Sequence, residues 1–207
     1  MKINKLLAAN LRGIVDRRLK NKSDFVIVVD GYEGSGKSTL SSQLCAFVAF
    51  LFDLTFTVKH ICFDLKGMIN TIKPLKKGHA VQVDEGVFYY KRSSMTKPNR
   101  VLNALFMRYR KKCLFWVICI PKFTDLDSYM REHRLGALIH IKERGSFEFY
   151  SRKRAMLIAK ADGDYNVSQP NFVGGFDDWM GCDKEEYEEL KDKSLQVFIE
   201  SELAEME

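Results

Sequence analysis

The stretch GYEGSGKST combines residue types and a spacing that are suited to holding phosphate groups. It matches the pattern G-x-x-x-x-G-K-S at Gly31, Gly36, Lys37 and Ser38. The glycines let the backbone curl so that successive N–H groups point at phosphate oxygens, and a helix N-terminus behind the loop adds partial positive charge. The lysine would reach the β- and γ-phosphates of a nucleotide, and the serine hydroxyl would bind Mg²⁺. The sequence therefore predicts a site for ATP and Mg²⁺, made by Gly31, Glu33, Gly34, Ser35, Gly36, Lys37, Ser38 and Thr39.

Two acidic residues, Asp84 and Glu85, follow the short, mostly apolar segment 80–83. A buried strand that ends in two acids is typical of a nucleotide-hydrolysing site, known as the Walker B pattern. Asp84 would hold Mg²⁺ together with Ser38, directly or through a water. Glu85 would orient and polarise the attacking water, which a phosphate-transferring kinase excludes. We therefore expect a Mg²⁺-dependent ATPase in which Lys37 and Glu85 are catalytic.

The phosphate loop alone also fits a different enzyme class. EGSGKST, with its acid at Glu33, resembles the loop of thymidylate kinases, and 207 residues is an ordinary size for such an enzyme. A nucleoside or nucleotide kinase therefore remains open as an alternative.

The elements that must position these residues follow from the hydrophobic pattern. Short apolar, β-branched runs predict buried strands at 25–29, 57–63, 80–85 and 113–121, the last being so apolar that we place it centrally. Helical patterns begin at the loop and recur at 65–72, 99–112 and 126–134. Strands that alternate with helices indicate an α/β fold with a mainly parallel sheet between two helical layers. Segments 135–144 and 146–154 flank Gly145 and predict a hairpin.

The chain divides into three predicted parts. Residues 1–22 have the pattern of a basic amphipathic helix, residues 23–162 form the ATPase core, and residues 163–207 form a C-terminal extension with an acidic helix. The helix at 1–22 either packs on the body or contacts DNA, another subunit or a membrane surface.

Charge is unevenly distributed along the chain. The net charge is +6, but residues 183–207 carry ten acids and three lysines, which leaves 30 bases and 17 acids in the first 182 residues. A basic body suggests a polyanionic partner such as DNA. No apolar run approaches the roughly 18–20 residues of a membrane span, and no secretory signal is visible, so we expect a cytoplasmic protein.

The order of motifs resembles a known family. The phosphate loop, then VDEG, a helix ending in RYRKK, an apolar strand and an LDSYMREHR segment are similar to viral ATPases described as zonular occludens toxin-like. These belong with the FtsK–HerA group of DNA pumps and viral genome-packaging ATPases. The resemblance covers roughly residues 24–200, and its two Walker motifs are the specific part.

This resemblance implies a RecA-like core of the ASCE class of P-loop NTPases and ATP hydrolysis that powers translocation of double-stranded DNA. It also implies self-association into a ring, usually a hexamer, contact with a capsid or portal component, and a place in the host cytoplasm or the virion. A nucleotide-dependent virion-assembly factor is a further alternative. Ring ATPases place an arginine of one subunit against the γ-phosphate of the next, and the candidates here are Arg108, Arg110, Arg131 and Arg134.

The sequence departs from the family at one position. Members of the group usually carry a glutamine that senses the γ-phosphate after the strand that follows Walker B. Here Pro121 and Lys122 stand there, so Lys122 or Thr124 would have to substitute.

The predicted hairpin is basic and aromatic. In KERGSFEFYSRKR, charges flank Phe147, Phe149 and Tyr150, a mixture that suits contact with nucleic acid. The alternative is a hairpin whose aromatic side chains pack inward.

Overall fold

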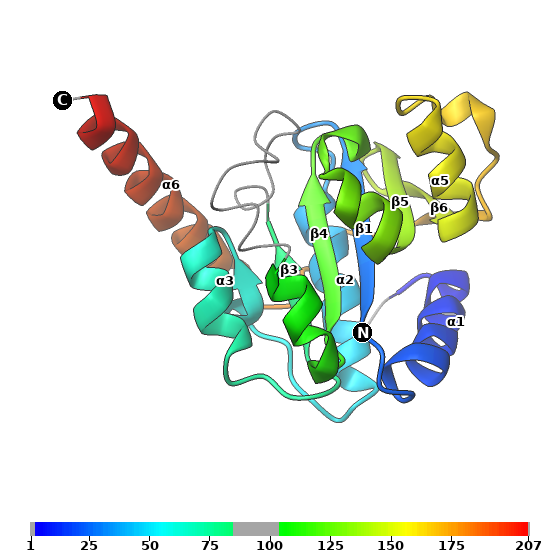
Figure 1. Ribbon diagram of the computed structural model, residues 1–207, viewed down its shortest axis with the longest axis horizontal. Coiled ribbons are helices and arrows are strands. Elements are labelled where there is room, and N and C mark those ends of the chain that lie inside the picture. The colour runs from blue at the N-terminus through cyan, green and yellow to red at the C-terminus, as the bar shows by residue number, and fades with distance from the viewer. Residues whose placement is uncertain (1–2, 85–103, 207) are drawn as a thin grey trace.

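The computed structural model describes residues 3–84 and 104–206, and its helices and strands alternate along most of the chain (Figure 1). The strands are β1 (Phe25–Gly31), β2 (Ile61–Cys62), β3 (Ala80–Val83), β4 (Phe115–Ile120), β5 (Leu135–Glu143), β6 (Ser146–Ser151) and β7 (Phe172–Gly175). The α-helices with defined bounds are α1 (Lys5–Ile14), α2 (Lys37–Phe50), α3 (Leu65–Ile72), α5 (Arg152–Lys160) and α6 (Lys184–Met206). Residues 104–109 are helical as well, and short π-helical segments occupy Val15–Leu19 and Met130–Arg134.

All seven strands form one sheet, in the order β2-β3-β4-β1-β5-β6-β7. The pairs from β2 through to β5 are parallel, and β6 and β7 add antiparallel strands at one edge. The strand β4 lies between β1 and β3, as its apolar sequence predicted. Because these strands are parallel, the residues that follow β1, β3 and β4 meet at the same edge of the sheet.

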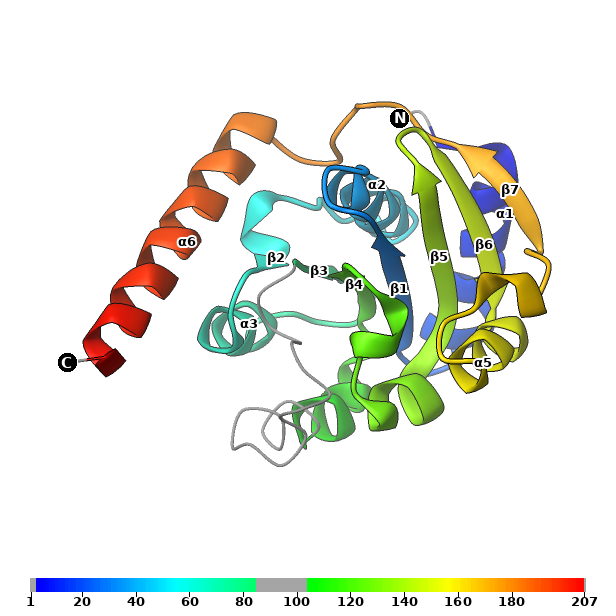
Figure 2. The same ribbon diagram turned by 90° about the horizontal axis from the view of Figure 1, so that it is seen from above.

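Apolar side chains alternate between the two faces of the sheet and build two cores. Ile27 and Val29 of β1 pack against α1 and α2, whereas Val26 and Val28 pack against α3, α5 and the helix at 104–109. The result is a helix–sheet–helix arrangement, visible when the molecule is seen from above (Figure 2). The predicted α/β three-layer fold with a mainly parallel sheet is confirmed.

The N-terminal helix belongs to this packing. Leu7 and Leu11 of α1 are fully buried, on the side of the sheet that also carries α2. The side chain of Asn4 caps the helix by accepting hydrogen bonds from the N–H groups of Leu6 and Leu7. Packing on the body, one of the two alternatives for this helix, is therefore what the structure shows.

At the edge of the sheet formed by β6 and β7, one sequence expectation was wrong, and one of two open alternatives was decided. The strand expected to run through 146–154 ends at Ser151, and its basic end starts helix α5 instead. The aromatic side chains of β6 are almost entirely buried in the two cores, with Phe147 0%, Phe149 5% and Tyr150 1% exposed. They pack inward, the alternative that the sequence left open, because successive side chains of a strand enter the cores on opposite faces of the sheet. They therefore offer no stacking platform for bases. Strand β7 was not expected at all.

The C-terminal helix α6 begins beside the sheet and then projects away from the body (Figures 1 and 2). No helix among the described residues is long and apolar enough to cross a membrane.

The packing of α1 gives a testable prediction. Replacing Leu11, which is 0% exposed, by alanine should lower the free energy of unfolding by about 2–5 kcal/mol because it leaves a cavity under α1. Leu6 on the same helix is 55% exposed, and its replacement by alanine should change stability by no more than about 0.5 kcal/mol. Urea unfolding measures the free energy of unfolding of both variants. If the Leu11 variant lost no more stability than the Leu6 variant, α1 would not be part of the folded core.

Candidate nucleotide site

The phosphate loop joins the end of β1 to the start of α2, and two glycines are needed for its path. Gly31 has φ +146°, and a Cβ atom there would lie 2.6 Å from the carbonyl oxygen of Ile141. Gly36 has φ +96°, and a Cβ atom there would lie 3.0 Å from the ring of Phe176. Both positions therefore demand a residue without a side chain, for conformation and for space.

The start of α2 is open to an anion. Its N-cap residue is Gly36, and no side chain caps the helix, so its first N–H groups are left for a ligand. The hydroxyl of Ser35 is buried, and it has no hydrogen-bond partner among the described residues. Lys37 is 4% exposed, and its Nζ donates to the carbonyl oxygens of Gly31 and Tyr32 at 3.0 and 2.9 Å. A cationic loop with an unpartnered buried hydroxyl fits a phosphate group.

A hydroxyl and a carboxylate meet beside this loop. The Oγ of Ser38 donates to Oδ1 of Asp84 at 3.0 Å, although the two residues come from α2 and from the end of β3. Asp84 is 1% exposed. Mg²⁺ prefers oxygen ligands and is usually held by one or two protein groups together with phosphates and waters. The Ser38–Asp84 pair has the donor atoms that such an ion needs.

The second oxygen of Asp84 is engaged by the C-terminal helix. The hydroxyl of Tyr187 donates to Oδ2 of Asp84 at 2.5 Å, and Tyr187 is only 3% exposed. Burial, followed by the charge of Asp84, raises the pKa of Tyr187 far above its ordinary value, so the hydroxyl keeps its proton and acts as the donor. In the described structure, Tyr187 thus occupies a position on Asp84 that a metal ion could take.

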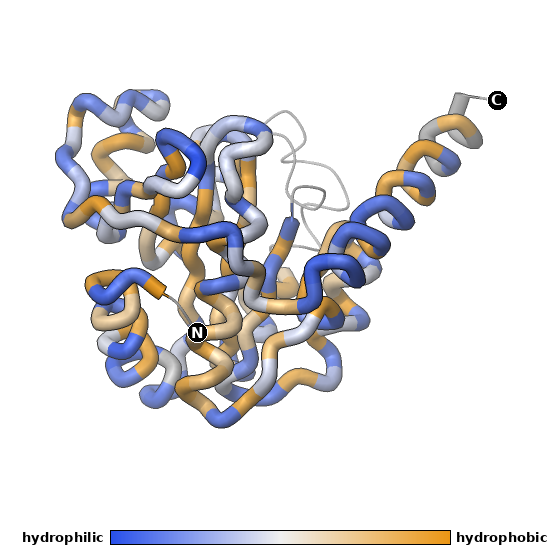
Figure 3. The backbone as a smooth tube through the Cα atoms, turned by 180° about the vertical axis from the view of Figure 1, so that it is seen from behind, coloured by the Kyte–Doolittle hydropathy of each residue, from blue (hydrophilic) through white to orange (hydrophobic). Residues whose placement is uncertain are grey.

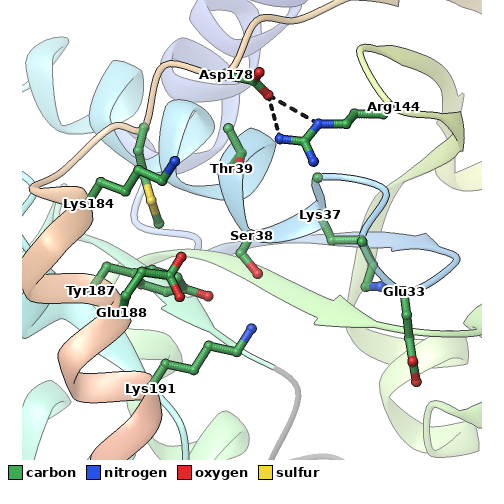
Figure 4. Close-up of a pocket in the computed structure, with 13 residues that line it drawn as sticks. Glu33, Lys37, Ser38, Thr39, Arg144, Asp178, Lys184, Tyr187, Glu188 and Lys191 are labelled. Carbon is green, nitrogen blue, oxygen red and sulfur yellow. Dashed lines mark hydrogen bonds and ion pairs between the residues drawn. The ribbon is translucent and has the colours of Figure 1, made fainter.

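A cavity of about 410 Å³ opens over the phosphate loop, and its far wall comes from the C-terminal segment (Figure 4). Arg144 at the β5–β6 turn and Asp178 form an ion pair of 2.9 Å across the mouth, with both side chains mostly exposed. The wall is formed by Asp178, Met180, Lys184, Tyr187, Glu188 and Lys191.

The wall is anchored on α2. Nε2 of Gln43 donates to the carbonyl oxygens of Asp177 and Trp179 at 2.9 and 2.6 Å, and the N–H of Gly181 donates to Ser42 Oγ at 3.0 Å. A Cβ atom on Gly181 would lie 2.1 Å from the carbonyl oxygen of Ser42, so chain and helix touch directly. The segment after β7 is consequently fixed to the same helix that begins at the phosphate loop.

The structure brings most of the predicted site together. Asp84 lies beside Ser38, and Ser35 and Gly31 shape the loop. Glu85, the predicted catalytic base, lies outside the described residues. The predicted residues that line the cavity are Glu33, Gly34, Gly36, Lys37, Ser38 and Thr39.

None of the four candidate arginines is among the described residues that line this cavity. Arg134 forms an ion pair with Asp24, at the edge of the sheet where β1 begins, and its side chain is 9% exposed. A guanidinium that is enclosed in its own chain is poorly placed to reach a neighbour, which makes Arg134 the weakest of the four. Arg108 and Arg110 are exposed, and Arg131 is half-buried.

The segment in which the sequence places its candidates for a γ-phosphate sensor, Lys122 and Thr124, follows β4. The carbonyl oxygen of Pro121 accepts a hydrogen bond of 3.3 Å from the N–H of Gly31, so the chain after β4 touches the phosphate loop. Lys122 is exposed, whereas Thr124 is 1% exposed beneath Gly163. Of the two candidates, Lys122 is therefore the more accessible side chain.

Sequence reasoning missed the residues that the C-terminal segment brings to the cavity. Tyr187, Lys184 and Lys191 are more than 140 positions from the loop in sequence and belong to a stretch that reads as an acidic solvated helix. No local motif marks them, because their place depends on how the chain after β7 returns across α2.

Comparisons with known proteins found solved structures only. No protein-family model and no curated protein matches the sequence. The N-terminal domain of zonular occludens toxin from Neisseria meningitidis is 15% identical over 80% of this chain and 98% of that chain, with a TM-score of 0.46. The genome packaging NTPase of Sulfolobus turreted icosahedral virus 2, solved in complex with AMPPCP, is 14% identical over 64% of this chain and 94% of that chain, with a TM-score of 0.45.

A third structure, the cytoplasmic domain of the type VII secretion ATPase EccC from Thermomonospora curvata, is 13% identical over 63% of this chain and 23% of that chain, with a TM-score of 0.36. The first two structures are of the kinds that the sequence resemblance named. At these identities and scores the likeness adds no argument about function, which has to come from the residues of this chain.

Proposed function

We propose that this chain binds ATP with Mg²⁺ in the cavity over the phosphate loop and hydrolyses it. The observation that carries the proposal is the contact between Ser38 and Asp84 beside the uncapped start of α2. It places an anion site and a pair of hard oxygen donors side by side, which is what a metal-bound triphosphate requires. Mg²⁺ would supply charge stabilisation as phosphate oxygens accumulate charge, and Lys37 would bind the β- and γ-phosphates.

The proposed role for the hydrolysis is movement of double-stranded DNA by a ring of subunits, as in viral genome packaging. Support comes from the family resemblance of the sequence motifs and from the excess of basic residues before position 183. An arginine from a neighbouring subunit would complete the site, with Arg108, Arg110 and Arg131 as candidates that are not locked in a buried ion pair.

Two substitutions test the assignment of roles. Lys37→Ala should abolish ATP binding because it removes the cation that faces the phosphates. Glu85→Gln should retain ATP binding and lower turnover by about 10²-fold or more, since it removes the group that activates water. Equilibrium binding and steady-state phosphate release separate the two effects. A Glu85→Gln protein with full turnover would refute the catalytic assignment, and transfer of phosphate to a nucleoside would favour a kinase.

The hydroxyl of Tyr187 should compete with the metal, because it holds one of the two oxygens of the carboxylate that would bind the ion. Tyr187→Phe keeps the buried ring and removes the hydroxyl. We expect it to tighten binding of ATP with Mg²⁺ by about tenfold, as a hydrogen bond to a charged group contributes about 1.5–3 kcal/mol. Binding measured in EDTA should be unchanged.

Tyr150→Phe is the matched control for this experiment. Its hydroxyl donates to Glu148 in strand β6, and neither residue lines the cavity over the phosphate loop. Calorimetric titration of the three proteins gives the affinities. Unchanged or weaker Mg²⁺-dependent binding by Tyr187→Phe would mean that Tyr187 does not compete with the ion.

A further inference from the structure

The outer half of α6 carries an exposed apolar stripe. Leu195, Ile199 and Leu203 recur at intervals of four on one side of the helix, and they are 57%, 48% and 58% exposed. This part of the helix projects from the body, and apolar segments alternate with hydrophilic ones along it (Figure 3). After Lys193 the chain contains four acids and no basic residue. The stripe therefore belongs to an acidic helix that leaves a large apolar area in water.

A groove of matching character lies between α1 and α2. It has a volume of about 440 Å³ and combines apolar residues, among them Phe47 and Phe50, with the cations Lys5 and Arg12. Phe50 is 62% exposed at the end of α2. A second cavity also includes Arg12 and is lined by Lys20 and Asp16, which form an ion pair of 2.8 Å. The floor of the groove is apolar, and its rim is basic.

We propose that the outer half of α6 docks into the α1–α2 groove of a second copy of this chain. The apolar stripe would cover Phe50 and its neighbours, while the acids of the helix would face Lys5 and Arg12. Apolar burial would supply the affinity and the opposite charges would fix the orientation. This inference deepens the proposed self-association and rests on it, because it names the two surfaces that meet.

The geometry of one chain excludes docking onto its own groove. Tyr187 fixes the root of α6 at Asp84, and α6 and α1 lie on opposite flanks of the sheet in both ribbon views. Residues 194–206 form a rod about 20 Å long, at about 1.5 Å per residue, that points outward. A contact between two different surfaces of identical chains is head-to-tail, and it repeats from subunit to subunit until a ring closes or a filament grows.

Two variants break the two surfaces separately. Leu195→Glu combined with Ile199→Glu places charges in the stripe and leaves the groove intact. Phe50→Glu places a charge in the groove and leaves the stripe intact. Light scattering at a concentration where the unaltered chain assembles should report a monomer for each variant. The control is Val197→Glu, since Val197 is 66% exposed on another side of α6 and its change should leave the assembly intact. Circular dichroism should show the same helix content in all four proteins.

Mixing the two variants gives the sharpest result. The Phe50→Glu chain still has its stripe and the stripe variant still has its groove, so an equimolar mixture should form a dimer and stop there. The proposal is overturned if the unaltered chain is a monomer, if either variant assembles normally, if Val197→Glu prevents assembly, or if the mixture stays monomeric.

The same samples keep this inference apart from the proposed function. Nucleotide binding by the isolated chain should persist in both monomeric variants, because neither surface contributes to the cavity over the phosphate loop. Assembly without nucleotide binding would contradict the proposed function and leave the docking intact, and nucleotide binding without assembly would contradict the docking alone.

Discussion

The hydrogen bond between Ser38 and Asp84 joins two segments whose meeting depends on the whole sheet. Ser38 stands at the start of α2, directly after β1, whereas Asp84 follows β3, and β4 lies between the two strands. The pair can form only if three parallel strands end at one edge and α2 crosses over them. The two apolar cores that cover the sheet therefore also serve to hold one hydroxyl and one carboxylate 3.0 Å apart.

The C-terminal segment adds one wall to the site at this edge. From β7 onward the chain crosses α2, where Gln43 and Ser42 hold its backbone, and α6 then delivers Tyr187 to Asp84. Access to the carboxylate is thereby tied to the position of one helix. Since the outer part of that helix is the proposed contact with another copy, assembly and occupation of the site would act on the same element. A neighbour that moves α6 would change the affinity of the site for a metal-bound nucleotide, and the reverse would hold as well.

Much of this arrangement follows from local sequence patterns. Continuous β-branched runs mark the buried strands. The loop from Gly31 to Ser38 identifies both its own conformation and its chemistry, because its positions of positive φ are all occupied by glycine. Asp84 could be assigned because it directly follows a predicted buried strand. The sequence could not show the role of residues that lie far from the phosphate loop in sequence but close to it in space. Tyr187 and Lys191 sit in a stretch without a motif, and β7 is short and rich in glycine. The aromatics of β6 are flanked by charges that suggest a surface. Arg134 was misleading because a single arginine looks the same whether it lies in a buried pair with Asp24 or faces a neighbour.

The measurement that bears most directly on the account is steady-state ATP hydrolysis by the purified chain with Mg²⁺, with and without double-stranded DNA. The account predicts turnover that requires Mg²⁺ and rises when DNA is added. Absence of ATP hydrolysis under both conditions, from protein whose folding has been verified, would contradict it.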